Sequence, residues 1–382
     1  MSTLLPHVWG EVMVPPGGAT EVSLAVSESY SGLTLPIPVF VRRGSEPGPA
    51  LFVTAALHGD ELNGTGAVRQ LIADSTLHLA RGTLLLVPVL NLLGFDRHSR
   101  YLPDRRDLNR CFPGAASGSL ASRMASIIFQ EIVGRCDFGV DLHTAAVRRT
   151  NFPNVRADLS EPRVAELARA FGSSIIVDGE GPDGSLRREA CRAGKPTIIL
   201  EGGEVWKVEP SVVEYAVRGV KNVLSHLGMI EEPAVEPPYQ VEVRQTTWVR
   251  ADHGGFLHMH VGPGDTVRAG APLATNTSLA GSVIEVFRSP VDAVVLGTVT
   301  LPSIAPGDPI CHLGVLEKSQ PGPGARGIDR RRGELPDDHL QNRLLGDLAT
   351  NMIVTDEPPI DPLTLAADDD ETDEGMGHEE DT

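Results

Sequence analysis

The sequence predicts an α/β protein with a mixed, mostly buried sheet, followed by a small all-β domain and an acidic tail. Between residues 50 and 228, apolar strand-like runs alternate with segments of helical apolar spacing, which is typical of a sheet covered by helices. Residues 239–316 have no helical period and are rich in Val, Gly, Pro and Thr. A length of 382 residues suits two or three domains of ~100–200 residues each.

Residues 1–49 are expected to form an N-terminal β segment that packs on the α/β domain after it. Polar and apolar residues alternate in Glu21–Val26 and again in Leu35–Val41, with Gly and Pro between them. Such alternation predicts strands that are buried on one face.

The α/β domain is predicted to span residues 50–230. Its apolar runs predict strands at Ala50–Leu57, Thr83–Leu90, Gly139–Leu142, Ser174–Val177 and Thr197–Leu200. Apolar residues at helical spacing predict helices at Asp60–Ala73, Ser119–Val133, Glu161–Phe171 and Ser211–Leu227.

A Pro- and Glu-rich linker at residues 231–238 leads into a small all-β domain at residues 239–318. This domain contains an approximate repeat, since the pattern at residues 261–267 recurs at residues 304–310. The pattern resembles the flattened sandwich of biotinyl and lipoyl carrier domains. Those domains carry a lysine at a hairpin tip, whereas no lysine occurs here between Lys221 and Lys318. We therefore expect a lid or wall of the active site rather than a swinging arm.

Residues 319–382 are predicted to be a disordered tail. The last part, residues 356–382, contains twelve acidic side chains and no Lys or Arg. Such a segment has too few large apolar residues to offset the entropy lost on ordering. We interpret it as a solvated, flexible tail without a specific role.

Charge and composition exclude several classes of partner. The formal net charge is −18 and only 4% of residues are aromatic, which argues against nucleic acid and against an anionic membrane surface. No apolar run approaches the ~20 residues of a membrane span, and the N-terminus does not resemble a signal peptide. The four cysteines have no paired spacing, which favours free thiols in a reducing compartment. We expect a soluble cytoplasmic protein.

The strongest chemical signal is the sequence HGDE at residues 58–61, where the first predicted strand ends. His58 and Glu61 can converge there across a strand-to-helix turn, with Gly59 between them. A catalytic Zn²⁺ needs three nitrogen or oxygen ligands and one open position, and His143 at the end of a later strand supplies the third ligand. Asp141 either orients a ligand or makes a local turn bond. A lone histidine is more often a buried structural residue, but the two segments together favour a metal site.

A carboxylate is then needed to move a proton from the attacking water to the leaving nitrogen. Glu201 follows the predicted strand Thr197–Leu200, which places it at the same edge of the sheet. Glu204 is its nearest rival, and a surface role is the alternative for either residue.

The segment after the second strand, residues 91–110, is rich in arginine inside an acidic body. Arginine clamps a substrate carboxylate with two parallel hydrogen bonds, and it also stabilises a developing oxyanion. Arg105 and Arg106 fit a solvated basic loop equally well, while Arg100, Asn109 and Arg110 fit it less well.

Five motifs follow one another in the chain: HGDE at 58–61, RY at 100–101, DLNR at 107–110, DLHT at 141–144 and ILEGG at 199–203. In this order they resemble the succinylglutamate desuccinylase/aspartoacylase family of the zinc carboxypeptidase-like superfamily. The similarity covers roughly residues 50–316. It implies one zinc ion per chain and a C-terminal β domain that narrows the channel, which selects small acyl amino acids over peptides. The resemblance implies metal ligands at His58, Glu61 and His143, promotion of water attack by Glu201, polarisation of the carbonyl by Arg100, and substrate binding by Tyr101, Asn109 and Arg110.

The segment after DLHT departs from the family pattern because it carries Arg148, Arg149 and Arg156. Whether these arginines select the substrate stays open, and so does the identity of the acyl group and of the amino acid. The sequence also leaves open whether the chain forms a homo-oligomer.

Three functions are compatible with these residues. The first is a zinc-dependent amidohydrolase that removes a short acyl group from a small N-acyl amino acid. The second is a zinc carboxypeptidase that cuts short peptides, which the expected narrow channel opposes. The third is a metal- or ligand-binding module without catalysis, which the complete ligand set and Glu201 oppose.

Overall fold

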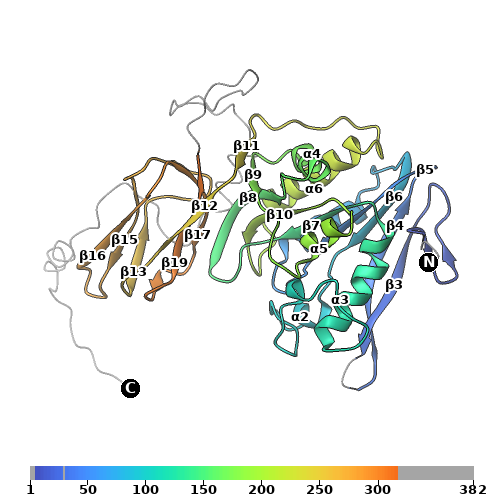
Figure 1. The fold of residues 1–382 in the computed structure, drawn as a ribbon, viewed down its shortest axis with the longest axis horizontal. Coiled ribbons are helices and arrows are strands. Elements are labelled where there is room, and N and C mark those ends of the chain that lie inside the picture. The colour runs from blue at the N-terminus through green and yellow to red at the C-terminus, as the bar shows by residue number, and fades with distance from the viewer. Residues whose placement is uncertain (1–4, 29–30, 317–382) are drawn as a thin grey trace, which may run out of the picture.

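A computed structural model describes residues 5–28 and 31–316 of the chain (Figure 1). The predicted tail at residues 319–382 lies outside the described residues. The N-terminal and catalytic regions lie together on one side of the molecule, and the C-terminal β domain lies beside them on the other.

Within the described ranges, thirteen strands form one large sheet. Ten of them follow a single path, in the spatial order β12 (Thr246–Arg250), β19 (Pro309–Val315), β17 (Ala293–Val299), β8 (Arg149–Ala157), β10 (Thr197–Glu204), β7 (Phe138–His143), β5 (Glu46–Ala55), β6 (Arg81–Val87), β4 (Thr34–Arg43) and β3 (Ala19–Glu28). Off this path, β9 (Ile175–Asp178) pairs with β8, β11 (Val241–Val243) with β9, and β14 (Thr266–Val267) with β17.

The predicted mixed α/β sheet is confirmed. The strands β6, β5, β7 and β10 are parallel, whereas β8 runs antiparallel to β10 and β4 antiparallel to β6. The parallel strands are buried on both faces, which explains their nearly continuous apolar runs. Their carboxyl ends meet at one edge of the sheet.

Helices cover both faces of this sheet and close two separate cores. One core includes residues of α1 (Asn63–Ala73), α4 (Pro162–Phe171) and α6 (Pro210–His226). The other includes residues of α3 (Leu120–Glu131) and α5 (Leu186–Arg192). The remaining short helices are α2 (Leu92–Phe95), η1 (Leu108–Arg110) and η2 (Val133–Arg135).

Local sequence signals explain the start of α3 and both ends of α4. The Ser119 hydroxyl accepts a hydrogen bond from the Ser122 amide at the start of α3. Pro162 opens α4, where a missing amide hydrogen does no harm, and Gly172 ends that helix with φ +79°.

Two element boundaries near the candidate site residues differ from the sequence prediction, and two elements were missed. The helix expected at Asp60–Ala73 begins only at Asn63, so Glu61 lies in the preceding turn. The strand expected at Thr197–Leu200 continues to Glu204, so Glu201 lies inside it. Strand β8 and helix α5 were not predicted, because charged and polar residues interrupt their apolar periods.

The N-terminal residues extend the sheet at its edge. Strands β3 and β4 form an antiparallel hairpin, and β4 pairs with β6. The short strands β1 (Val8–Trp9) and β2 (Val12–Met13) pair with each other. The Arg135 guanidinium lies 4.2 Å from the centre of the Trp9 ring, which ties this hairpin to η2.

The predicted all-β region at the C-terminus is confirmed. A four-stranded sheet of β16 (Val283–Arg288), β15 (Pro272–Thr277), β13 (Gly255–Met259) and β18 (Ser303–Ile304) shares a core with β14, β17 and β19 of the large sheet. The sequence repeat forms two equivalent turns. The Asp265 carboxylate accepts from the Gly262 amide at 2.8 Å, and the Asp308 carboxylate accepts from the Ala305 amide at 2.9 Å.

The sheet is continuous between the catalytic and C-terminal regions. Strand β17 pairs antiparallel with β8, so Gly297 lies opposite Asn151. Strand β11, which follows the predicted linker, pairs with β9 of the catalytic region. A wall of the C-terminal domain is therefore built directly onto the strand beside Glu201.

Among the described helices, none is both long and apolar enough to cross a membrane.

Candidate active site

Three side chains predicted to bind metal converge at the carboxyl edge of the parallel strands. His58 follows β5, Glu61 lies in the turn before α1, and His143 ends β7, the parallel neighbour of β5. Glu61 lies between the two imidazoles, with Oε1 2.7 Å from His58 Nδ1 and Oε2 2.9 Å from His143 Nδ1. One ligand atom from each residue lies within 4.8 Å of the others, and all three side chains are buried.

Two further carboxylates hold the outer nitrogens of these imidazoles. His58 Nε2 lies 3.2 Å from Asp107 Oδ1, and His143 Nε2 lies 2.8 Å from Asp141 Oδ2. The Thr54 hydroxyl donates to the other oxygen of Asp141 at 2.7 Å. Of the two roles open for Asp141, the structure therefore shows the orienting contact with His143.

The electrostatics of the cluster suit a cation. Burial works against the charged form of Glu61, but the two imidazoles hold its pKa below the usual range. Burial likewise disfavours a charged His143, yet Asp141 and Glu61 raise its pKa well above the usual value. Two imidazoles, one carboxylate and carboxylates behind the imidazoles match the donor set and outer contacts of a zinc site. The described residues thus fit the predicted metal, and their role as ligands stays a prediction.

The backbone around HGDE is unusual at two positions. Ala56 has φ +46°, a left-handed conformation, just before the chain reaches His58. The sequence suggested that Gly59 allows the chain to bend. The structure gives steric space as the reason for glycine, because a Cβ there would lie 2.0 Å from the Gly94 carbonyl carbon. The close approach of Gly94 therefore excludes any larger residue at position 59.

Arg100 lies beside the cluster. Its Nη1 donates to Glu61 Oε1 at 3.3 Å, and its Nη2 donates to Asp107 Oδ2 at 3.0 Å. The side chain is 24% exposed, so one side of the guanidinium stays accessible. The structure thus places Arg100 against Glu61, one of the predicted metal ligands, and its role toward a substrate carbonyl stays a prediction.

Glu201 lies in β10 directly beside His143 of β7, since the two residues are register partners on parallel strands. Asn151 Nδ2 donates to Glu201 Oε2 at 3.2 Å, and Arg156 Nε lies 3.7 Å from Oε1. Its rival Glu204 is engaged elsewhere: Oε1 accepts from the Thr300 hydroxyl at 2.7 Å, and Oε2 pairs with Lys207. The structure thus brings Glu201, and not Glu204, next to a predicted metal ligand.

The three residues expected to bind substrate differ in how far their side chains are exposed to solvent. Asn109 is buried, and its Oδ1 accepts from the Leu186 amide at the start of α5 at 2.9 Å. Arg110 is exposed and donates to the Asn109 carbonyl at 2.7 Å. Tyr101 is 49% exposed. Their role in substrate binding stays a prediction.

One arginine near the site was not singled out from the sequence. Arg187 is only 5% exposed, and its Nε and Nη1 have no hydrogen-bond partner. Burial, together with the charge of Arg156, lowers its pKa to about 10, while Cys191 and Glu201 oppose this shift. A helix start at Ser185 was the sequence signal that could have located this arginine, since Gly184-Ser185 precedes a short amphipathic run. The Ser185 hydroxyl caps α5 by accepting a hydrogen bond from the Arg188 amide.

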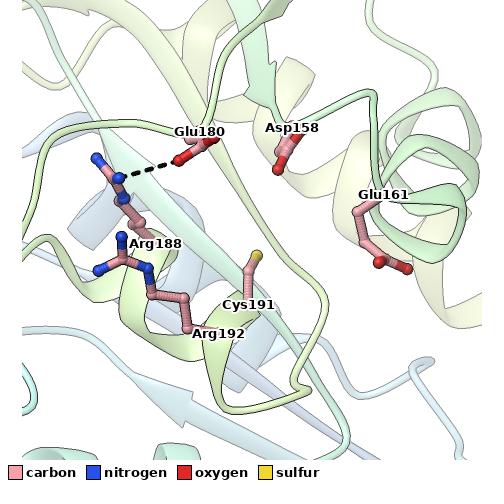
Figure 2. A pocket seen from close by; sticks show the side chains of 6 residues that line it. All are labelled: Asp158, Glu161, Glu180, Arg188, Cys191 and Arg192. Atoms are coloured by element: carbon pink, nitrogen blue, oxygen red, sulfur yellow. Dashed lines mark ion pairs between the residues drawn. The ribbon is translucent and has the colours of Figure 1, made fainter.

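A cavity of about 210 Å³ lies beside α5 (Figure 2). Its lining residues include Arg188, which pairs with Glu180 at 3.0 Å, and Cys191, whose pKa is raised by burial. None of the predicted metal ligands, nor Glu201, lines it. The cavity is therefore separate from the cluster at the sheet edge.

Comparisons with known proteins point to one family. Residues 47–227 match the model of the succinylglutamate desuccinylase/aspartoacylase catalytic domain. The chain is also 27% identical over 316 residues to the N-alpha-acetyl-L-2,4-diaminobutyric acid deacetylase of Halomonas elongata. That alignment covers 79% of this chain and 92% of the relative.

Solved structures share the fold. The product-bound ectoine utilization protein EutE (DoeB) from Ruegeria pomeroyi superposes with a TM-score of 0.71 at 24% identity, over 80% of this chain and 98% of that one. A succinylglutamate desuccinylase from Silicibacter sp. TM1040 gives a TM-score of 0.70 at 23% identity, with the same coverage. Both extend beyond the matched catalytic domain into the C-terminal β region.

Proposed function

Because residues 47–227 form a catalytic domain of the succinylglutamate desuccinylase/aspartoacylase family, we propose that this protein is a zinc-dependent deacylase that hydrolyses the amide bond of a small N-acyl amino acid. The observation that carries the proposal is the buried His58–Glu61–His143 cluster with Glu201 beside it on the neighbouring strand. The deacetylase named for the Halomonas relative supports the same class of reaction.

His58, Glu61 and His143 would hold the zinc ion, one per chain. When bound, zinc supplies a Lewis acid that polarises the amide carbonyl and makes water more acidic. Asp107 and Asp141 keep the two imidazoles oriented through their outer nitrogens. The protein's own contribution is thus a ligand set held in position by buried hydrogen bonds.

Glu201 accepts a proton from the attacking water and delivers it to the leaving nitrogen, so that the amide yields a carboxylate and a free amine. Its contact with Asn151 restrains one oxygen of the carboxylate. Arg100 stabilises the negative charge that develops on the carbonyl oxygen. Its own position is fixed by Asp107.

A substrate carboxylate would find its partner in Arg187. This buried guanidinium has two unpartnered nitrogens and lies close enough to Glu201 for the two charges to interact. An isolated buried charge is unfavourable until an anion compensates it. Asn109 acts on this arginine indirectly, because its side chain holds the first amide of α5. Arg110 and Tyr101, at the exposed rim, would make the outer contacts of the substrate.

The C-terminal β domain would form a wall of the channel. The pairing of β17 with β8 supports this role, because it places the domain on the strand that carries Asn151 and Arg156. Its two equivalent turns support the resemblance to a biotinyl or lipoyl sandwich. We also assign the protein to the cytoplasm, which its four free cysteines support.

The proposal is tested by metal analysis and a substrate panel. Purified protein is expected to contain about one zinc ion per chain and to release the acyl group from at least one N-acyl amino acid. Short peptides are included because a carboxypeptidase would cleave them instead. Treatment with a chelator should abolish turnover, and zinc should restore it. Metal-free protein with full activity, or cleavage of peptides alone, would contradict the proposal.

A further inference from the structure

Strand β10 is irregular directly after Glu201. Its register with β7 ends at the pair of Glu201 and His143, and its register with β8 shifts between Glu201 and Gly203. Gly202 lies at this bulge. A bulge in a strand changes the direction in which the neighbouring side chain points. The position of the Glu201 carboxylate therefore depends on what holds Gly202 and Gly203 in place.

Two buried side chains, those of Asn63 and Glu209, hold this bulge. Asn63 Nδ2 donates to the Gly202 carbonyl at 3.3 Å and to Glu209 Oε2 at 2.7 Å. The same Glu209 oxygen accepts from the Glu204 amide at 2.9 Å, and the Glu209 amide donates to Asn63 Oδ1 at 2.7 Å. Asn63 is 2% exposed and Glu209 is 6% exposed. The pair thus binds the backbone on both sides of Gly203.

Gly203 fits closely against the pair. Its φ of +75° is a left-handed conformation that favours glycine. A Cβ at this position would lie 2.0 Å from Glu209 Oε2 and 2.3 Å from Asn63 Nδ2. The bare backbone of Gly203 is therefore in contact with both side chains, so a change in the pair moves the end of β10.

The bulge is also joined to the segments of two predicted metal ligands. Asn63 is the first residue of α1, two positions after Glu61. On the other side, the Gly203 carbonyl accepts at 3.1 Å from the amide of Ala145, two positions after His143. The backbone that follows the proposed proton acceptor is thus tied to both ligand segments by buried hydrogen bonds.

We propose that Asn63 and Glu209 are positioning residues, which fix the Glu201 carboxylate relative to the metal ligands through the bulge at Gly202. The inference rests on the proposed deacylase function, in which Glu201 moves the proton. Both residues act through the backbone of β10 and not on the reacting atoms. A misplacement of about 1 Å costs roughly 10²-fold in rate, so the pair controls kcat.

Glu209→Leu tests the pair, because leucine accepts no hydrogen bond from Asn63 or from the Glu204 amide. In zinc-loaded protein we expect kcat to fall by about tenfold or more and KM to change less than about threefold. Glu209→Gln should restore most of kcat, since its amide oxygen can accept both hydrogen bonds. A kcat of Glu209→Gln as low as that of Glu209→Leu would overturn the inference. Asn63→Ala removes the same contact from the other side, so the test does not depend on one variant that must fold.

A double-mutant cycle separates the positioning of Glu201 from general damage. In Glu201→Gln protein the carboxylate that the pair positions is already absent. Adding Glu209→Leu there should lower kcat less than about threefold, because residues that act as a unit are not additive. An equal loss of kcat in both backgrounds, or a loss of zinc in Glu209→Leu, would show that the pair does not act through Glu201.

Asn222→Leu is the matched control. Asn222 is also buried and bonded through its side chain, to Phe171 and Val235 near the other end of α6. Its replacement should lower the stability of the protein and leave kcat within about threefold of wild type, as expected for a residue distant from the site. A loss of kcat equal to that in Glu209→Leu would overturn the inference.

Amide hydrogen exchange separates this inference from the proposed function, because it needs no substrate. Exchange of the Glu204 and Ala145 amides should be faster in Glu209→Leu than in wild type or Asn222→Leu. If it is faster but wild type hydrolyses no N-acyl amino acid, the pair still holds the strand of Glu201 and the deacylase function is wrong. If wild type is a deacylase and Glu209→Leu keeps its kcat, the function stands and the positioning is wrong.

Discussion

Glu201 and His143 are register partners on the parallel strands β10 and β7, although 57 positions separate them in the chain. Partners on adjacent strands carry their side chains on the same face of the sheet. The neighbouring pair of strands shows this directly, because the Thr54 hydroxyl of β5 donates to Asp141 of β7, its own register partner. A carboxylate in β10 is thereby held next to the proposed metal ligand at the end of β7.

Replacing His143 with alanine should remove the metal. The remaining two ligands, His58 and Glu61, cannot form the three-residue site that zinc requires. Elemental analysis should find about one zinc ion per chain in wild type and almost none in the variant. His78→Ala is the control, because His78 is exposed and outside the cluster. Full zinc occupancy in His143→Ala would contradict the assignment of this ligand.

Glu201→Gln should keep the metal and lower kcat by about 10²–10⁴-fold, because an amide does not accept the proton of the attacking water. Glu204→Gln is the matched control, since Glu204 contacts Thr300 and the exposed Lys207 instead of the site. It should change kcat less than about threefold, because both oxygens of Glu204 are engaged outside the cluster. Steady-state kinetics with zinc-loaded variants measures both. A larger loss in Glu204→Gln than in Glu201→Gln would reverse the two roles.

Arg187→Met should stabilise the protein while weakening substrate binding. The guanidinium is buried with two unpartnered nitrogens, and an apolar side chain of similar length removes that penalty. Denaturant unfolding should show a gain of roughly 1–3 kcal/mol, whereas KM should rise. Arg188→Met tests the neighbouring arginine, which is paired with Glu180 and Asp183 and should not gain stability. A destabilised Arg187→Met variant would show that the buried charge is compensated in the free protein.

Gly297→Ala should disturb the site from the C-terminal domain. The added methyl group would lie 2.4 Å from Asn151 Oδ1 and 2.7 Å from the Thr150 carbonyl oxygen, so the pairing of β17 with β8 must shift. We expect a loss of about 1–3 kcal/mol in unfolding free energy, together with reduced kcat. Gly262→Ala, which has no heavy atom within 4 Å of the new methyl group, serves as the control. Wild-type kcat in Gly297→Ala would argue against coupling through Asn151.

His312 should make the protein sensitive to acid. Burial, together with the charges of Arg156 and Arg149, lowers its pKa to about 3. Below a pH of about 6.5 the unfolded chain binds a proton there that the folded protein does not bind, so stability is lost as the pH falls from about 6.5 toward 3.

At pH 5 this loss should be roughly 2 kcal/mol relative to the plateau above pH 7. His312→Gln removes the titrating group, so its unfolding free energy should change less between pH 7 and pH 5 than that of wild type. Denaturant unfolding at both pH values gives the comparison, and any constant effect of losing the stacking of His312 on Trp248 cancels in the difference. Equal acid sensitivity of the two proteins would show that His312 is not the responsible group.

Much of the fold was predictable because its signals are local. The apolar runs around Phe52 and Leu85 indicated buried strands, and the structure confirms the mixed sheet that they belong to. Strand β5, which precedes HGDE, ends at Ala55, within two residues of the predicted end at Leu57. Strand β8 escaped prediction because polar and charged residues interrupt its apolar pattern, and two of them, Asn151 and Arg156, contact Glu201 instead of a core. A mixture of polar and charged residues is also typical of a loop, so the sequence of this segment did not indicate a strand.

The sequence by itself determined the three predicted metal ligands of the site. His58 and Glu61 are three residues apart, and His143 ends its own apolar strand, so local patterns were enough to place all three at one edge of the sheet. Only the tertiary structure decided which other charges reach that edge. Arg149 and Trp248 are 99 positions apart, and the charge of Arg187, on a short helix without a strong apolar period, interacts with that of Glu201. Their positions depend on the pairing of β17 with β8 and on the hydrogen bond between α5 and Asn109 of η1. Both interactions join segments far apart in the chain, so no local sequence pattern predicts them.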